Sequence, residues 1–199
     1  MRCFMEKLNT KADFLSAFWQ LYEKKDINKI SIGELCRLAG YNRTTFYVYY
    51  KDIYDLLNKA VDSIFMPIKE EIFSSLDITN VLENDIVKQL FSNILTRNEK
   101  QIELLFLHQH YLILAEKLKQ EFLALIRKEL KNEAGSMESV EYIFEYQLSA
   151  LFGVIKYWFT TGKKLPESDL ASLIYSISIR GALPSIRAAL IEKPKIATN

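Results

Sequence analysis

The chain has 199 residues, enough for one good-sized domain or for a small domain joined to a larger one. Hydrophobic residues make up 49% of it, and the formal net charge of +1 argues against a protein that binds polyanions over its whole surface. Residues 1–60 hold ten Lys and Arg against seven Asp and Glu, a net charge of +3, whereas the remaining residues hold sixteen against eighteen, a net charge of −2. This asymmetry suits an N-terminal nucleic-acid-binding part on a neutral or acidic body.

The compartment is indicated by cysteine usage and by the absence of long apolar runs. Cys3 and Cys36 form neither a metal-ligand spacing nor a disulfide framework. The N-terminal segment has no apolar stretch typical of a signal peptide. The most apolar segment, 142–159, carries Glu145 and Lys156 and falls short of the roughly 20 apolar residues of a membrane span. We expect a cytoplasmic protein without membrane contact.

Scarce proline and glycine, and no sustained alternation of apolar residues, predict an all-α protein of about nine helices. The first helix is expected over residues 10–24. The second begins at Ser31, because Ser31 and Glu34 have the spacing of a capping box. It ends at Gly40, where a left-handed conformation costs least.

Asn42 is expected to cap a third helix over 43–49, and Asp52 a fourth that Pro67 kinks or ends. Further helices are expected near 79–97, 99–115, 116–132, 138–161 and 167–191. Breaks are expected at Asn98, 132–135 and 161–166. We divide the chain into a domain of residues 1–65 with three helices in a helix-turn-helix arrangement, and a helical bundle of residues 66–199.

The third helix has two unlike faces when its residues are placed about 100° apart on a wheel. Phe46, Tyr49 and Tyr50 cluster on one side and can close a small core. The opposite side carries Thr44, Tyr47 and Val48, flanked by Arg43 and Thr45, and has no acid. A helix that enters the major groove needs donors, acceptors and methyl groups, without carboxylates that repel phosphate. Two short helices joined across 39–41 therefore predict a helix-turn-helix.

A set of residues from 30 to 57 carries a family resemblance. The set is Ile30, Ser31, Leu35, Ala39, Gly40, Thr45, Phe46, Tyr47, Tyr50, Asp55, Leu56 and Leu57. With these residues in this order, residues 10–65 resemble the DNA-binding domain of the TetR/AcrR family of bacterial transcriptional regulators. The resemblance implies double-stranded operator DNA as partner. The C-terminal part of these proteins diverges widely, and there the prediction depends on the helical pattern alone.

The predicted DNA-binding residues are Ser31, Arg43, Thr44, Thr45, Tyr47, Tyr49 and Lys51. By resemblance, Arg43, Thr44 and Thr45 fall where family members touch base edges, and Tyr47 and Tyr49 where they contact phosphate or sugar. The fork of Arg43 matches O6 and N7 of guanine. Lys51 adds a charge, and Ser31 lies at a helix N-terminus, where phosphate is favoured.

Three positions depart from the family pattern. Ile53 stands where many members carry a lysine that binds phosphate. Val48 is often polar or basic in relatives, and Gly33 occupies a site that can hold a base-reading side chain. We expect fewer direct base contacts, and an affinity that is salt-sensitive but modest for each monomer.

The last two predicted helices are the expected homodimer surface, since two half-sites about 34 Å apart require two copies. The family commonly dimerises through this pair. The alternative is that these helices form only the core of the monomer. Their apolar and small residues are Ile143, Phe144, Leu148, Ala150, Leu151, Gly153, Ile155, Trp158, Leu173, Ile177 and Leu183.

An unknown small-molecule effector is expected between the middle helices, where relatives enclose apolar or aromatic ligands. The candidate lining residues are Phe91, Phe106, His110, Tyr111, Tyr146 and Phe152. The alternative for each is ordinary core packing. His108 and His110 would point about 200° apart on a helix, so they cannot form a local metal pair. We expect no cofactor and no metal, and we interpret Cys36 as a buried hydrophobe.

These patterns predict a dimeric transcriptional regulator, a repressor that a small-molecule effector releases. A second hypothesis is a partner-dependent activator of the same family, with direct DNA binding weakened by the missing lysine at Ile53. An enzyme is not expected, because the sequence has no Ser-His-Asp grouping, no phosphate-binding loop and no metal ligands at usable spacing.

Overall fold

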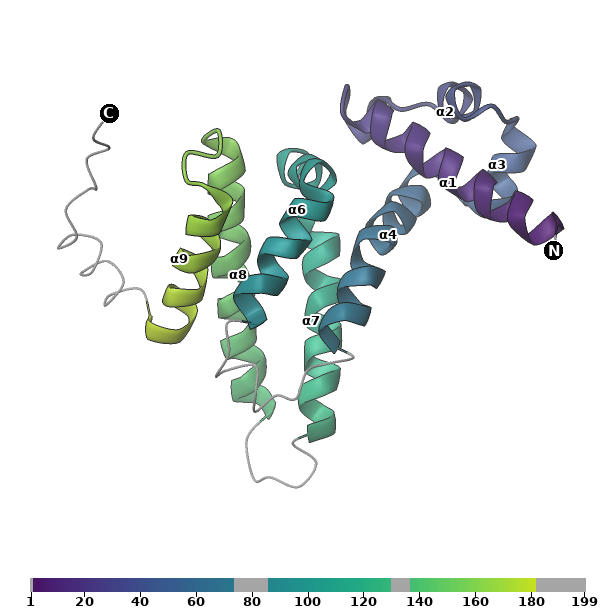
Figure 1. Ribbon diagram of the computed structural model, residues 1–199. Helices are drawn as coiled ribbons and strands as arrows, with labels where there is room; N and C mark the ends of the chain where they lie inside the picture. Colours follow the sequence, from purple (N-terminus) through teal and green to yellow (C-terminus); the bar gives the residue numbers. More distant parts are fainter. Residues whose placement is uncertain (1, 74–85, 130–136, 182–199) are drawn as a thin grey trace. The chain divides into compact units, whose positions relative to one another are not determined.

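The computed structural model describes residues 2–73, 86–129 and 137–181 (Figure 1). Within these ranges all regular structure is helical, which confirms the all-α prediction. The elements are α1 (Arg2–Tyr22), a 3₁₀ turn (Ile27–Lys29), α2 (Ile32–Ala39), α3 (Arg43–Tyr49), α4 (Ile53–Phe73), α6 (Ile86–Leu107), α7 (Tyr111–Glu129), α8 (Met137–Thr160) and α9 (Glu167–Arg180). None of the described helices is long and apolar enough to cross a membrane.

Local hydrogen bonds set the ends of α2 and α3 as predicted. The Ser31 hydroxyl accepts from the Glu34 N–H at 3.2 Å, and Gly40 closes α2 in the left-handed conformation with φ of 80°. The Asn42 side-chain oxygen accepts from the Thr45 N–H at 2.8 Å, which caps α3. These bonds satisfy backbone groups that a helix end leaves without an intrahelical partner.

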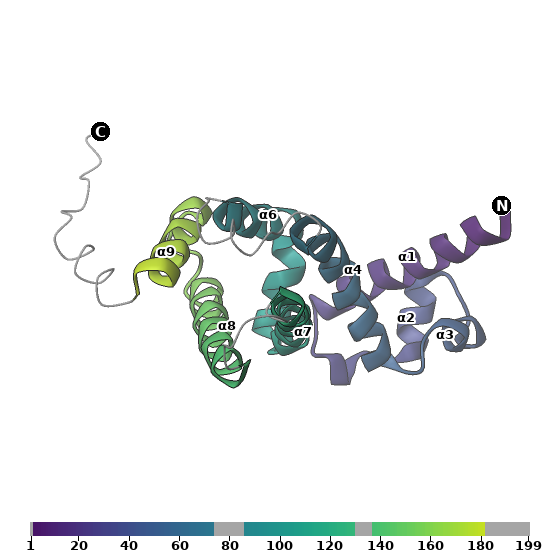
Figure 2. The ribbon, with the colours of Figure 1, turned by 90° about the horizontal axis from the view of Figure 1, so that it is seen from below.

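Two compact units make up the chain, and the first consists of Met1–Glu71 and Asn98–Leu118. In it α2 packs against α1 and α3 (Figures 1 and 2). The edge-to-face ring pairs of Phe14 with Phe46 and with Tyr50, at 5.6 and 5.8 Å, join α1 to the end of α3. The other buried side chains of its first segment include Phe18, Tyr22, Ile27, Ile30, Leu35, Cys36, Leu56, Leu57, Ala60, Val61 and Ile64. These side chains form one core.

The fourth helix runs past Pro67, where the sequence predicted either a kink or an end. Asp52 caps it as expected, by accepting from the N–H groups of Tyr54 and Asp55, each at 2.8 Å. However, α4 does not end near Pro67 but continues to Phe73 with the proline inside it. Proline removes one backbone donor, but the buried side chains beside it, Phe65 and Ile68, keep this turn of the helix packed.

The predicted break between residues 115 and 116 is wrong, because the chain turns at residues 108–110 instead. Gln109 has a φ of 62°, and the His110 N–H donates to the Leu105 carbonyl at 2.8 Å. His108 and His110 are thus not on one helix, so the premise that separated them by about 200° fails. The predicted break at Asn98 is confirmed, since its φ and ψ of −129° and 21° are not helical.

The second unit consists of Ile72–Arg97 and Lys119–Asn199, and in it α8 packs against α9. The Trp158 indole N–H donates to the Leu165 carbonyl at 2.7 Å and ties the end of α8 to the turn that leads into α9. Of the predicted dimer residues, Ile155 and Trp158 are buried and Ile143 is exposed.

The end of α9 differs from the prediction. The helix stops at Arg180, because Gly181 has φ and ψ of 86° and 166°, outside the helical region. The rest of the helix predicted to residue 191, with Leu183, lies outside the described residues, as do the break at 132–135 and residues 79–85 of another predicted helix.

Candidate nucleic-acid interface

The short helix α3 separates buried rings from exposed polar groups. Phe46 is fully buried, with an exposed fraction of 0%, and Tyr50 is buried beside it. Tyr47 and Val48, next in sequence to Phe46, are 58% and 70% exposed, and Thr44 is exposed as well. The two predicted faces of this helix are therefore confirmed, except that Tyr49, predicted with the core rings, is half-buried.

The first turn of α3 holds the residues predicted to touch bases. Arg43 and Thr44 are exposed, and the Arg43 guanidinium lies over Gly33 of α2. Thr45 is half-buried, and its N–H and its hydroxyl both donate to the Asn42 side-chain oxygen, at 2.8 and 3.0 Å. Because its proton is used in the cap, Thr45 can offer a base only acceptor capacity and a methyl group.

Positive charge near the end of α3 comes partly from a residue that sequence reasoning missed. The Lys11 ammonium of α1 lies 6.0 Å from the centre of the half-buried Tyr49 ring. Lys11 precedes Phe14 by three residues, so both lie on the same side of α1, and Phe14 packs on α3. This spacing was the sequence signal that could have placed Lys11 beside α3. Lys11 and Tyr49 together form the edge of the exposed surface of α3.

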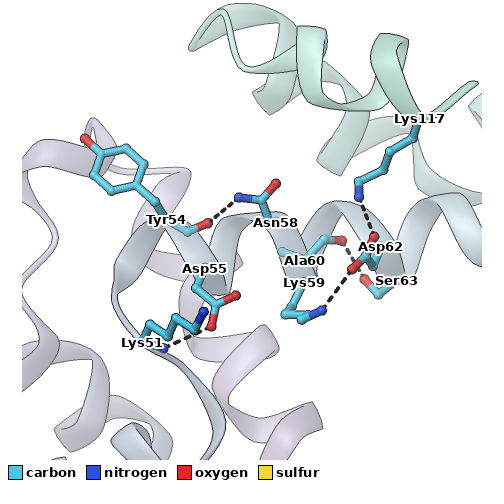
Figure 3. Close-up of polar contacts among 9 residues, drawn as sticks. All are labelled: Lys51, Tyr54, Asp55, Asn58, Lys59, Ala60, Asp62, Ser63 and Lys117. Atoms are coloured by element: carbon cyan, nitrogen blue, oxygen red, sulfur yellow. Dashed lines mark hydrogen bonds and ion pairs between the residues drawn. The ribbon is translucent and has the colours of Figure 1, made fainter. Parts of the chain in front are cut away.

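Lys51, by contrast, has a carboxylate beside its backbone, that of Asp55 (Figure 3). Its backbone N–H donates to the Asp55 carboxylate at 2.9 Å, and Asp52 next to it caps α4. Burial, followed by the charge of Asp55, raises the pKa of Tyr50 to about 12, so this hydroxyl stays neutral. Ile53, in the position where the family often has lysine, is half-buried at the start of α4. The corner between α3 and α4 is therefore less basic than the family pattern implies.

The acids nearest to α2 already have partners. Lys25 forms an ion pair with Glu34, and this hydrogen bond is the largest of the effects that hold the pKa of Glu34 below its usual value. The backbone N–H of Ser31 lowers it further, as in a capping box. The Asp13 carboxylate accepts from the Tyr41 hydroxyl at 2.8 Å. Ser31 itself is exposed, at the N-terminus of α2.

The six residues predicted to line an effector site are divided between the two units. The rings of Phe106 and Tyr111 stack with centres 4.7 Å apart in the first unit. Tyr146 is 68% exposed and Phe152 is buried, both in the second unit. Phe91 falls in α6, and its side chain lies outside the described residues.

His110, the sixth of these residues, is held by a buried tyrosine. The Tyr22 hydroxyl and the Nδ1 atom of His110 are 2.6 Å apart, and the rings of Tyr22 and His108 have centres 4.4 Å apart. Burial, with the nearby charge of Asp26, raises the pKa of Tyr22, and burial lowers the pKa of His110. Tyr22 follows Phe18 by one turn of α1, but nothing in the sequence indicated its histidine partner.

Comparison with known proteins does not assign the chain to a family: no protein-family model matches it, and no curated protein matches it. Among the described residues, no group of three or more His, Cys, Asp or Glu side chains could hold one metal ion. The exposed residues of α2, of α3 and of the turn between them carry hydroxyl groups, an amide, methyl groups and the guanidinium groups of Arg37 and Arg43. These groups suit hydrogen bonding with a partner that carries negative charge.

Proposed function

We propose that the chain is a transcriptional regulator of the TetR/AcrR type that binds double-stranded DNA. Helices α2 and α3 would form a helix-turn-helix, with α3 in the major groove. The observation that carries the proposal is the outer face of α3, where Arg43, Thr44, Tyr47 and Val48 are exposed and no acid is present. Base edges in the major groove offer hydrogen-bond donors, acceptors and thymine methyl groups, which match these side chains.

The exposure of Tyr47 and Val48 supports a binding role for this face. The core beneath it is already closed by Phe46 and Tyr50, so the fold does not require large apolar groups outside. An aromatic ring and a branched aliphatic side chain, adjacent on a helix and both exposed, favour contact with a partner. A hydroxyl on that ring can reach a phosphate oxygen while the ring covers sugar.

The charge distribution supports binding that depends on salt. Arg43 and Lys11 lie beside the face, while the nearby carboxylates of Glu34 and Asp13 are hydrogen bonded within the protein. Each phosphate that a cation neutralises contributes a slope of about −0.9 to the dependence of log affinity on log salt. With few cations for each copy, useful affinity requires two copies on one site.

An exposed face of α8 supports assembly into a homodimer. Tyr142, Ile143, Tyr146 and Tyr157 are exposed on this helix, and Gly153 has open space where a side chain would be. Burying such rings against a second copy would remove apolar surface from water, at about 25 cal/mol for each Å². A dimer would present two copies of α3 to half-sites about 34 Å apart or a multiple of that distance.

An effector would act through the segment 98–118, which packs in the same unit as α1 and α4. Lys117 pairs with Asp62 of α4 at 2.8 Å (Figure 3), and Lys100 pairs with Glu23 at 2.8 Å. A small molecule that moves this segment would therefore act on the helices that support α3. It can shift the regulator only by its difference in affinity between the two arrangements.

Selection of bound fragments from random DNA tests the proposal on the full chain. We expect enrichment of a sequence with two related half-sites, and an affinity that falls as salt rises. Arg43→Ala should reduce enrichment, and Lys164→Ala, which removes an exposed charge in the other unit, serves as the matched control. A bound pool no different from the starting pool would contradict the proposal.

The second candidate is an activator of the same family that needs a partner protein. Its support is the weakly basic corner after α3, where Ile53 replaces the usual lysine and Asp52 and Asp55 follow Lys51. Measuring DNA binding with and without a partner protein distinguishes the two. An affinity for the selected sequence that appears only when the partner protein is present would favour the activator.

A further inference from the structure

The Arg43 guanidinium packs on the neighbouring helix at residue 33, and it has room there because residue 33 is glycine. A Cβ atom built on Gly33 would lie 2.8 Å from Nη2 of Arg43, 3.5 Å from its Nε and 3.6 Å from its Cζ. Real Cβ atoms essentially never approach another heavy atom within 3.0 Å. The guanidinium therefore covers the backbone of α2 at a place that any other residue would fill.

Two further observations support this placement. Burial raises the pKa of the Cys36 thiol, and the charge of Arg43 opposes that rise. The guanidinium is therefore close enough to α2 to act on the Cys36 thiol of that helix. In the part of the chain that the structure describes, no carboxylate forms an ion pair with Arg43. The guanidinium is thus placed by the space above Gly33, with its donors left for an external acceptor.

The position of Arg43 on α3 explains why the two helices meet here. Arg43 is the first residue of α3, and side chains of a helix lean toward its N-terminus. The turn Gly40–Asn42 brings that end of α3 back toward α2, so the long side chain reaches the first turn of α2. Gly33 is the second residue of α2 and half-buried.

We propose that Gly33 is a specificity-determining residue, because its missing side chain sets the direction from which the Arg43 guanidinium reads a base. This inference rests on the proposed DNA-binding function. With Gly33, the guanidinium can approach the backbone of α2 closely, and this close approach sets the direction of its fork. A methyl group at residue 33 displaces the fork, so the bidentate contact to one base pair is weakened while phosphate contacts stay.

Gly33→Ala tests this with little risk to the fold. Gly33 lies within a helix, alanine is the better helix former, and the atom it meets is the end of a flexible side chain. We expect the preference at one base pair to fall by roughly fivefold or more, since one bidentate contact contributes about 5- to 150-fold. The salt dependence of binding should be unchanged, because no phosphate contact is lost.

The control is the same substitution in an Arg43→Ala background. If Gly33 acts through Arg43, Gly33→Ala has no further effect there on the selected sequence. An equal effect in both backgrounds would overturn the inference, since it would mean that residue 33 meets the DNA directly. An unchanged sequence preference in the single variant would overturn it as well. If the unaltered protein selects no sequence, the proposed function itself fails, and this inference with it.

A measurement without DNA keeps the inference testable should Gly33→Ala not fold. In the free protein, nuclear Overhauser effects should connect the α-protons of Gly33 to the side-chain protons of Arg43. Their presence is expected from the packing of the guanidinium on residue 33. Their absence would refute the arrangement, whatever the DNA experiments show.

Discussion

Replacing Phe46 and its neighbour Tyr47 by alanine should have different effects, the first on the stability of the protein and the second on its affinity for DNA. Phe46 is fully buried, with the rings of Phe14, Tyr47 and Tyr50 5.4 to 5.6 Å away. Replacing it by alanine removes the centre of this cluster and leaves a cavity, which costs about 3–5 kcal/mol for a buried phenylalanine. A domain of ordinary stability has about 5–15 kcal/mol in total. Phe46→Ala should therefore lose a large part of the stability of the first unit.

Tyr47→Ala should instead leave the free energy of unfolding within about 0.5 kcal/mol of the original value, because Tyr47 is 58% exposed. Its expected effect is on DNA. A hydrogen bond from the Tyr47 hydroxyl to a phosphate would be charge-assisted, and such bonds contribute about 1.5–3 kcal/mol. Tyr47→Phe separates the hydroxyl from the ring, since it removes only the hydroxyl.

Urea denaturation followed by circular dichroism gives the stabilities, and titration with the selected DNA gives the affinities. Equal destabilisation by Phe46→Ala and Tyr47→Ala would show that the two faces of α3 are assigned wrongly. Full affinity in Tyr47→Ala, with stability unchanged, would show that this face of the helix does not contact DNA. Either result refutes the reasoning, and the two results refute different steps of it.

Three further predictions concern the same unit. Arg43→Ala should weaken binding to the selected sequence by about 1–3 kcal/mol and reduce the preference for the natural base at one base pair. Lys51→Ala should weaken binding to all DNA sequences alike and reduce the slope of log affinity against log salt by about one. Titration at several salt concentrations measures both effects. Asn42→Ala removes the cap of α3 and should lower the free energy of unfolding by about 1 kcal/mol, while Asn42→Gly should cost only a few tenths. Because burial lowers the pKa of His110 in the folded state, its stabilising effect is complete above the unfolded pKa of about 6.5 and is lost as pH falls toward the folded pKa. His110→Gln should flatten the curve of stability against pH over that acidic range, and a curve as steep as the original would contradict this.

The sequence predicted the ends of α2 and α3 because their causes are local. The side chains of Ser31 and Asn42 each accept a hydrogen bond from the backbone three residues later. Gly40 ends α2 through its own left-handed conformation. The two faces of α3 followed from helical geometry alone, since seven residues fix which side chains lie together. These features need no knowledge of the rest of the chain.

The features that sequence reasoning missed depend on residues far apart. The turn at 108–110 contains no proline or glycine, and His110 is bound by Tyr22, 88 residues earlier in the chain. The sequence left open whether α4 ends or kinks at Pro67, and its continuation depends on the buried side chains beside the proline, Phe65 and Ile68. The contact of Arg43 with Gly33 requires the angle between two helices, which a wheel for each helix does not give.

The links within the first unit differ in what they can transmit to α3. The pairs Lys117–Asp62 and Lys100–Glu23 are partly or largely exposed to water, and such ion pairs contribute roughly 0–1 kcal/mol. The bond between Tyr22 and His110 joins a fully buried ring to the turn between α6 and α7, and leaving one of its partners unsatisfied would cost about 1–3 kcal/mol. Coupling between an effector and DNA is typically about 1–3 kcal/mol, a range that this one bond covers and that the two ion pairs together reach only in its lower part. If an effector acts on residues 98–118, we therefore expect Tyr22→Phe, which removes only the hydroxyl that meets His110, to weaken the coupling more than Lys117→Ala does.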